Sequence, residues 1–182
     1  MDWPSEHHSG TQTPPQGWIA EVFAARRQTL VNYTSHLLRR DCEEAADVVQ
    51  DSFVRLCQQP WPEIESKAVA WLYRTCRNRA IDILRREKRM STAKLGDEAT
   101  QVTDTSAGDP GHAIDQDEQL GRVREQLASL SRKQQEVLRL RLHDGLSYKQ
   151  IAEVTGLTVS NVGYQIHDAI IRLRRKLHAE GG

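Results

Sequence analysis

Apolar residues recur every three or four positions in two long stretches of this chain, and a segment without that spacing separates them. The periodic stretches lie within residues 18–90 and 116–182, and the separating segment covers residues 91–115. Spacing of this kind lines apolar side chains along one face of an α-helix. The pattern therefore predicts an all-α chain of two small helical domains joined by a linker.

Helix boundaries are marked by local signals in both domains. Three helices are expected in the first domain, at residues 18–40, 43–59 and 67–89. In the second domain, Ser131 and Ser147 each precede a Gln by three residues, the S-x-x-Q pattern of a capping box at a helix start. Gly145 is placed to end the helix that Ser131 begins, and Thr158 can cap a last helix at residues 159–178.

The formal net charge is zero, but the charges are segregated along the chain. Residues 67–90 hold eight Lys or Arg against two acids, whereas residues 91–118 hold seven acids against one Lys. Residues 119–182 form a second basic block, with eleven Lys or Arg against six acids. Basic blocks of this kind are typical of proteins that bind a polyanion, and the acidic linker is expected to be flexible, extended and kept away from nucleic acid. Residues 1–17 are rich in Pro, Gly, Ser, Thr and His without apolar period, which predicts a disordered tail.

Several classes of protein are disfavoured by the sequence. It contains no Gly-rich phosphate loop, no metal-ligand cluster, and no nucleophile with a base in recognisable spacing, so we expect no enzymatic activity, cofactor or metal site. No apolar run approaches the roughly 20 residues of a membrane span, so we expect a cytoplasmic protein without membrane insertion. Cys42, Cys57 and Cys76 lack close metal-ligand spacing and are expected to be reduced core thiols.

Residues 146–170, LSYKQIAEVTGLTVSNVGYQIHDAI, have the layout of a helix-turn-helix. Ile151 and Ala152 should face inward, and the last helix should present an exposed stripe to the DNA major groove: Ser160, Asn161, Tyr164, Gln165, Asp168, Arg172 and Arg175. Asn161 and Gln165 are residue types that read adenine, because their amides donate and accept at once. A small helical hairpin that binds protein remains an alternative to DNA binding. The basic cluster at residues 172–176 suits phosphate contacts and, equally, the negative end of the helix dipole.

The helix expected at residues 67–89 has a basic face. One stripe of it holds Arg74, Arg77, Arg85 and Lys88, and beside this stripe lie Asn78, Asp82, Arg86 and Arg89. Trp71 and Tyr73 lie near its start, and a basic face with aromatic residues suits backbone contacts and stacking on unpaired bases. Taken singly, each aromatic is more typical of a core position, since Tyr73 falls on the apolar stripe of this helix.

Four stretches, in order and at these separations, resemble the extracytoplasmic-function (ECF) group of sigma-70 factors, which are small two-domain subunits of RNA polymerase. They are AADVVQDSFVRL at 45–56, AWLYRTCRNRAIDILRR at 70–86, LSRKQQEVLRLRLHDGLSYKQIAEVTGLTVSNV at 130–162, and residues 167–173. The resemblance implies a region 2-like bundle of three or four helices, which binds core polymerase and melts the promoter −10 element. It also implies a region 4-like helix-turn-helix domain that reads the −35 element and rests on the polymerase flap.

The resemblance also implies roles for individual positions. Asp47, Gln50 and Asp51 are similar to the part of the family that docks on the clamp helices of the largest polymerase subunit, and carboxylates there suit a basic partner. The loop at residues 59–67 is similar to one that helps to hold a flipped base. An anti-sigma factor is a further partner that the family suggests.

This chain departs from the family at Gly163, Gln165 and Asp168, where basic residues are common. A carboxylate at Asp168 can repel phosphate or accept a hydrogen bond from a cytosine amino group. Gly163 can allow a close approach to DNA or to a neighbouring helix. Two other functions stay open: a sigma-like decoy or adaptor that binds an anti-sigma factor, and a helix-turn-helix regulator that acts on duplex DNA alone.

Overall fold

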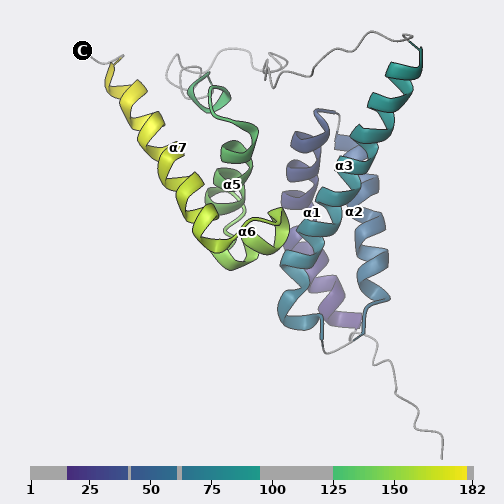
Figure 1. Ribbon diagram of the computed structural model, residues 1–182. Helices are drawn as coiled ribbons and strands as arrows, with labels where there is room; N and C mark the ends of the chain where they lie inside the picture. The colour runs from purple at the N-terminus through teal and green to yellow at the C-terminus, as the bar shows by residue number, and fades with distance from the viewer. Residues whose placement is uncertain (1–15, 41, 61–62, 95–124, 180–182) are drawn as a thin grey trace, which may run out of the picture. The chain divides into compact units, whose positions relative to one another are not determined.

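The computed structural model describes residues 16–40, 42–60, 63–94 and 125–179, and every regular element in these ranges is helical (Figure 1). The chain divides between Lys94 and Leu95 into two compact units. The predictions of a disordered tail and a flexible linker concern segments that lie almost wholly outside the described residues.

The N-terminal unit is a bundle of three helices that pack against one another in every pairing (Figure 1). They are α1 (Gln16–Leu38), α2 (Cys42–Cys57) and α3 (Ala68–Lys94), and a short 3₁₀ turn, η1 (Glu65–Lys67), leads into α3. Helix α3 continues five residues beyond the expected end at residue 89 and into the predicted linker. Residues 91–94 contain neither Gly nor Pro, so no local signal stops the helix there.

Aromatic and aliphatic side chains from all three helices form the core of this unit. The rings of Tyr33 and Tyr73 meet edge to face in this core with centroids 5.2 Å apart. At the edge of the core, the buried Phe53 ring meets the ring of Phe23, which is 39% exposed, with centroids 4.9 Å apart. Such pairs contribute about 0.5–1.5 kcal/mol beyond the burial of their area. Tyr73 is fully buried, so it belongs to the core and is excluded from stacking on a base.

The three cysteines differ in their surroundings. Cys76 of α3 is buried, its thiol donates to the Ser52 hydroxyl oxygen at 3.3 Å, and burial raises the pKa of Cys76 to about 11. Cys42 and Cys57 are exposed, so the expectation that all three lie in the core is wrong for these two. They are the first and last residues of α2 and lie off its buried stripe, where solvent reaches the helix.

The C-terminal unit contains α5 (Arg132–Leu142), α6 (Tyr148–Thr155) and α7 (Val159–Ala179), preceded by a helical turn at residues 125–128 (Figure 1). Both predicted capping boxes are present: Ser131 with Gln134 and Ser147 with Gln150 exchange side-chain and backbone hydrogen bonds. Its buried apolar side chains include Val137, Leu140, Ile151, Val154, Val162, Ile166 and Ala169. Ala152, which was expected to face inward with Ile151, is only half-buried, and Val154 lies in the core instead.

Two glycines set the turns of this unit. Gly145, between α5 and α6, has φ of +71°, and Gly156, which caps α6, has φ of +76°. Both values lie in the left-handed region, where a Cβ atom is disfavoured. Across the described residues, no helix combines the length and apolar character needed to cross a membrane.

Candidate nucleic-acid interface

An exposed stripe runs along α2 on the side opposite its buried residues. Asp47, Gln50 and Asp51 all lie on it, as the sequence predicts. Val54 follows one turn later on the same stripe and is 53% exposed. Val54 is not among the predicted site residues, although an apolar residue off the buried stripe of an amphipathic helix is a signal that the sequence contains. Carboxylates around one exposed valine are a surface that a basic protein partner with an apolar spot would fit.

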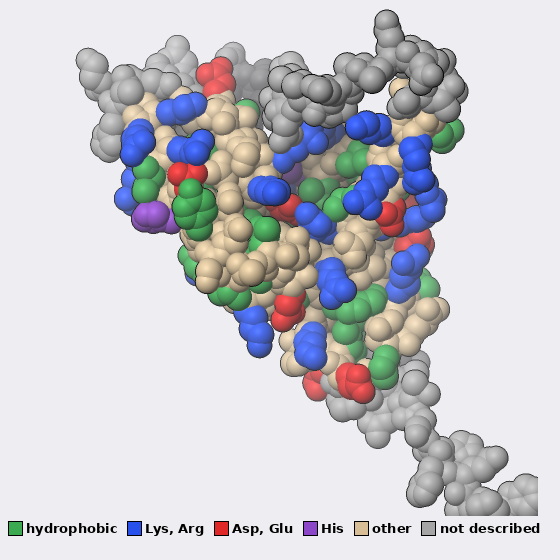
Figure 2. Space-filling model, in the orientation of Figure 1, with side chains coloured by type: hydrophobic (Ala, Val, Ile, Leu, Met, Phe, Trp, Pro, Cys, Tyr) green, Lys and Arg blue, Asp and Glu red, His purple; other side chains and the backbone are tan. Residues whose placement is uncertain are grey.

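The predicted basic face of α3 is a surface feature of the N-terminal unit, and Figure 2 shows Lys and Arg side chains along this helix. Arg74, Asn78, Asp82, Arg85, Arg86 and Lys88 are exposed, whereas Arg77 is half-buried. Arg85 lies 4.0 Å from the Asp82 carboxylate, the limit of an ion pair, with both side chains largely in solvent. A row of solvated guanidinium groups of this kind can neutralise successive phosphates of a nucleic-acid backbone.

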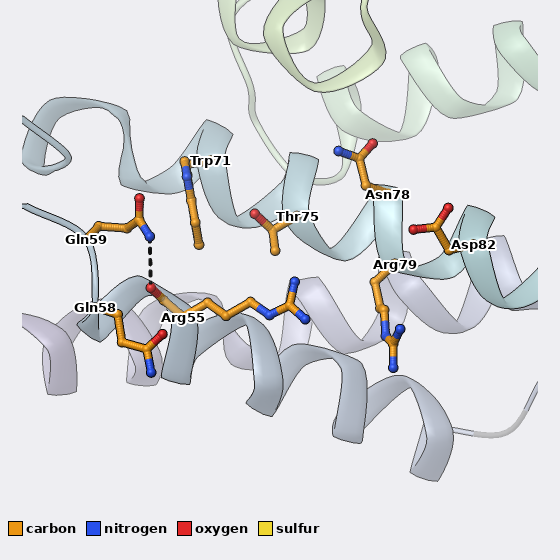
Figure 3. A pocket seen from close by; sticks show the side chains of 8 residues that line it. All are labelled: Arg55, Gln58, Gln59, Trp71, Thr75, Asn78, Arg79 and Asp82. Carbon is orange, nitrogen blue, oxygen red and sulfur yellow. Dashed lines mark hydrogen bonds between the residues drawn. The ribbon is translucent and has the colours of Figure 1, made fainter.

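A groove of about 440 Å³ lies between the end of α2 and the first half of α3 (Figure 3). Its lining comprises Arg55, Gln58, Gln59, Trp71, Thr75, Asn78, Arg79 and Asp82. The Gln59 side-chain amide donates to the Arg55 carbonyl oxygen at 3.2 Å, so it satisfies a carbonyl group in the last turn of α2. The half-buried Trp71 supplies a flat aromatic surface, and the amide, carboxylate and guanidinium groups supply donors and acceptors.

The groove includes residues that were not among the predicted site residues. Of the loop at residues 59–67, only Gln59 lines it, and residues 61–62 lie outside the described residues. Arg55, Gln58, Thr75 and Arg79 were not predicted, because they meet only through the packing of α2 on α3. An aromatic ring in this position can stack on a single unpaired base, and the polar groups around it can form hydrogen bonds with the edges of that base.

The start of α7 is the exposed end of the helix-turn-helix. The Thr158 hydroxyl accepts the Asn161 backbone N–H at 3.2 Å and so caps the helix, as predicted. Ser160, Asn161 and Tyr164 are exposed, as expected. Gln165 was expected on the same exposed stripe but is half-buried, and its amide donates to the Asn161 side-chain oxygen at 3.3 Å. Amide side chains held in register on an exposed helix can read base edges in a major groove.

Asp168 differs from its predicted place on the exposed stripe. Its side chain is only 26% exposed, and its Oδ2 atom accepts hydrogen bonds from Gln134 Nε2 at 2.7 Å and from Arg172 Nε at 2.8 Å. Arg172 and Arg175 are exposed, as expected. The expectation of a fully exposed carboxylate is therefore corrected, because α5 packs beside α7 at this point.

Gly163 faces a neighbouring helix of its own domain. A Cβ atom built on Gly163 would meet Cε2 of Tyr148, from the start of α6, at 3.7 Å, which is an ordinary van der Waals distance. The Tyr148 ring in turn lies under the Arg141 guanidinium, 5.4 Å from the ring centroid. The packing of Tyr148 against α7 therefore leaves room for a methyl group at residue 163.

Two family profiles match the two units separately. The profile described as Sigma-70 region 2 matches residues 22–90, and the one described as Sigma-70, region 4 matches residues 120–173. The chain belongs to the sigma-70 family, in its ECF group, with a region 2 and a region 4 domain. It is an RNA polymerase sigma factor that directs transcription initiation, and sigma factors are not enzymes.

Relatives with curated descriptions agree with this assignment. The chain is 27% identical over 164 residues to the RNA polymerase sigma factor YlaC of Bacillus subtilis, covering 87% of this chain and 91% of that one. It is 29% identical over 168 residues to the ECF RNA polymerase sigma factor SigK of Mycolicibacterium vanbaalenii, covering 87% and 83%.

Two solved structures have a similar fold. One is the sigma factor RpoE in complex with the anti-sigma factor NepR from Bartonella quintana, with a TM-score of 0.56 and 20% identity, covering 87% of this chain and 96% of that one. The other is CnrH in complex with the cytosolic domain of CnrY, with a TM-score of 0.53 and 23% identity, covering 91% and 90%.

Proposed function

We propose that the two domains divide the work of promoter recognition, with residues 18–90 engaging core polymerase and the −10 element and residues 116–182 engaging the −35 element. The groove between α2 and α3 carries this proposal, because it adjoins a row of exposed arginines on α3. Backbone phosphates would lie along Arg74, Arg85 and Arg86, and one unpaired base would enter the groove against Trp71.

Charge reversal tests the −10 assignment. The R74E variant is expected to bind core polymerase like the wild type and to open promoter DNA poorly, because one phosphate contact is replaced by repulsion. Permanganate reactivity of unpaired thymines measures the opening. The R27E variant is the matched control, because Arg27 is an exposed arginine on α1. Equal opening by wild type and R74E would count against the assignment. A wild-type chain that binds an anti-sigma factor but opens no promoter with core polymerase would support a decoy instead.

Helix α2 is the proposed docking surface for core polymerase. Asp47, Gln50 and Asp51 suit the clamp helices of the largest subunit if those helices present basic side chains, and Val54 supplies an apolar contact at the same stripe. The double variant D47K/D51K should therefore lose affinity for core polymerase, and the loss should be largest at low salt. The second domain is proposed to rest on the polymerase flap.

Helix α7 is the proposed reader of the −35 element. The exposed residues Ser160, Asn161 and Tyr164 and the half-buried Gln165 lie near its start, where they can meet base edges. Arg172 and Arg175 follow where phosphates would lie. A protein with this task works beside the chromosome, so we place it in the cytoplasm.

An anti-sigma protein is a further proposed partner. The support is the fold shared with RpoE, which was solved in complex with the anti-sigma factor NepR. A protein that co-purifies with the tagged chain and is displaced by added core polymerase is the expected finding. Co-purification that added polymerase leaves unchanged would argue against an anti-sigma role.

A further inference from the structure

One carboxylate on α7 joins this helix to α5. Asp168 Oδ2 on α7 accepts from Nε2 of Gln134, 34 residues earlier in the chain and in the first turn of α5, at 2.7 Å. The same Gln134 caps α5, since its Oε1 atom accepts the Ser131 backbone N–H at 3.1 Å. One amide therefore completes the capping box with its oxygen and holds α7 with its nitrogen.

The burial of these groups separates Asp168 from the base-reading residues. Gln134 is 4% exposed, so it is out of reach of DNA. Asp168 Oδ2 already has two donors, Gln134 and Arg172, and hydrogen bonds to a charged acceptor are among the stronger ones in proteins. By contrast, Tyr164, one turn earlier on α7, is 64% exposed.

We propose that Asp168 is a positioning residue of the −35 recognition helix, acting through Gln134, and not a residue that selects a base. The proposal rests on the proposed reading of the −35 element by α7. Asp168 fastens α7 to the capped start of α5 and keeps the Arg172 guanidinium along its own helix. Asn161, Tyr164 and Gln165 then select the bases, and the Gln134–Asp168 bond fixes the orientation of α7 relative to α5.

The chemistry of the pair allows a reciprocal test. The Q134E variant keeps an oxygen for the Ser131 N–H, since Glu also completes a capping box, but it sets two carboxylates against each other. The double variant Q134E/D168N has the same net charge as the wild type and reverses donor and acceptor across the same contact. The new amide can donate to the new carboxylate, and its oxygen can still accept from Arg172.

The experiment uses holoenzyme formed with core polymerase, and promoters randomised in the −35 element with a fixed −10 element, at a temperature well below unfolding. For Q134E we expect transcription to fall about fivefold for all −35 sequences, with the order of preference unchanged, and for Q134E/D168N we expect recovery to within about twofold of wild type. The D168A variant should show the same uniform fall, although removing a negative charge near phosphates would by itself strengthen binding.

Each other outcome overturns the proposal. A changed base preference at one −35 position in D168A, with Q134E unaffected, would make Asp168 a base reader. Increased transcription by D168A would make it only a source of repulsion. If the double variant does not recover, the Gln134–Asp168 contact is not the cause of the fall in transcription. This comparison does not need D168A, so it holds even if D168A does not fold. Wild-type transcription that does not depend on the −35 sequence would instead refute the proposed function of α7.

Discussion

Replacing Gly163 with alanine should stabilise the C-terminal unit. Gly in a helix interior is up to about 1 kcal/mol less favourable than Ala, and part of the gain from substitution comes from the lower entropy of the unfolded chain. The added Cβ would lie 3.7 Å from Tyr148 Cε2, so it adds a contact without overlap. We expect the free energy of unfolding to rise by about 0.5–1 kcal/mol, or roughly 3–6 °C in Tm for a domain of this size.

Two other glycines of the same unit are matched controls for this substitution. Gly145 and Gly156 have φ of +71° and +76°, and nothing lies within 4 Å of a Cβ built on either. The left-handed backbone alone should make G145A and G156A destabilising by about 1–2 kcal/mol. The change from Gly to Ala is therefore expected to raise the free energy of unfolding at Gly163 and to lower it at Gly145 and Gly156, because the backbone conformations differ.

The two units can be followed separately in the assay. All four Trp residues precede residue 72, so Trp fluorescence reports the N-terminal unit, whereas far-ultraviolet circular dichroism reports both. Urea and thermal unfolding of the full chain should shift the circular-dichroism transition of the C-terminal unit and leave the fluorescence transition in place. Destabilisation by G163A, or a shift of the same sign in all three variants, would refute the reasoning.

Further predictions concern docking, thiol chemistry and capping. V54S should weaken binding to core polymerase by about tenfold in a fluorescence titration, since burying a valine contributes roughly 1.5–3 kcal/mol. An unchanged affinity would show that Val54 is not part of the interface. Brief alkylation at pH 8 should label the exposed Cys42 and Cys57 but spare the buried Cys76, and equal labelling of all three would contradict this. Burial raises the pKa of Cys76 from 9.0 to about 11, so the free energy of unfolding should fall as the pH rises between these values, because the thiol ionises once unfolding exposes it. S131A should cost the C-terminal unit about 1 kcal/mol in urea unfolding through loss of the cap, and no change would show that the cap contributes nothing.

Features of the fold that depend on neighbours in sequence were predictable. The capping boxes at Ser131 and Ser147 need only a residue three positions later, and helical spacing was sufficient to place most of the apolar core. The end of α3 was missed because residues 91–94 carry no strong signal in either direction. Cys42 and Cys57 were misplaced because the usual burial of cysteine does not show which positions of a helix face solvent.

Features of the site that depend on how helices cross were not predictable. The groove joins residues of α2 to residues of α3, and its shape follows from their packing. The bond from Gln134 to Asp168 spans 34 positions, and without the crossing of α5 and α7 the carboxylate looks like a free group on an exposed stripe. The exposed residues at the start of α7 were predictable, since helical period and the position of the turn are enough to identify them.

Transcription with the purified chain tests the central claim most directly. The chain would be added to core RNA polymerase on a genomic template, and the 5′ ends of the transcripts would be sequenced. The account predicts defined start sites preceded by shared −10 and −35 sequences, which disappear with the D47K/D51K variant. Transcripts no more defined than those of core polymerase alone would contradict it.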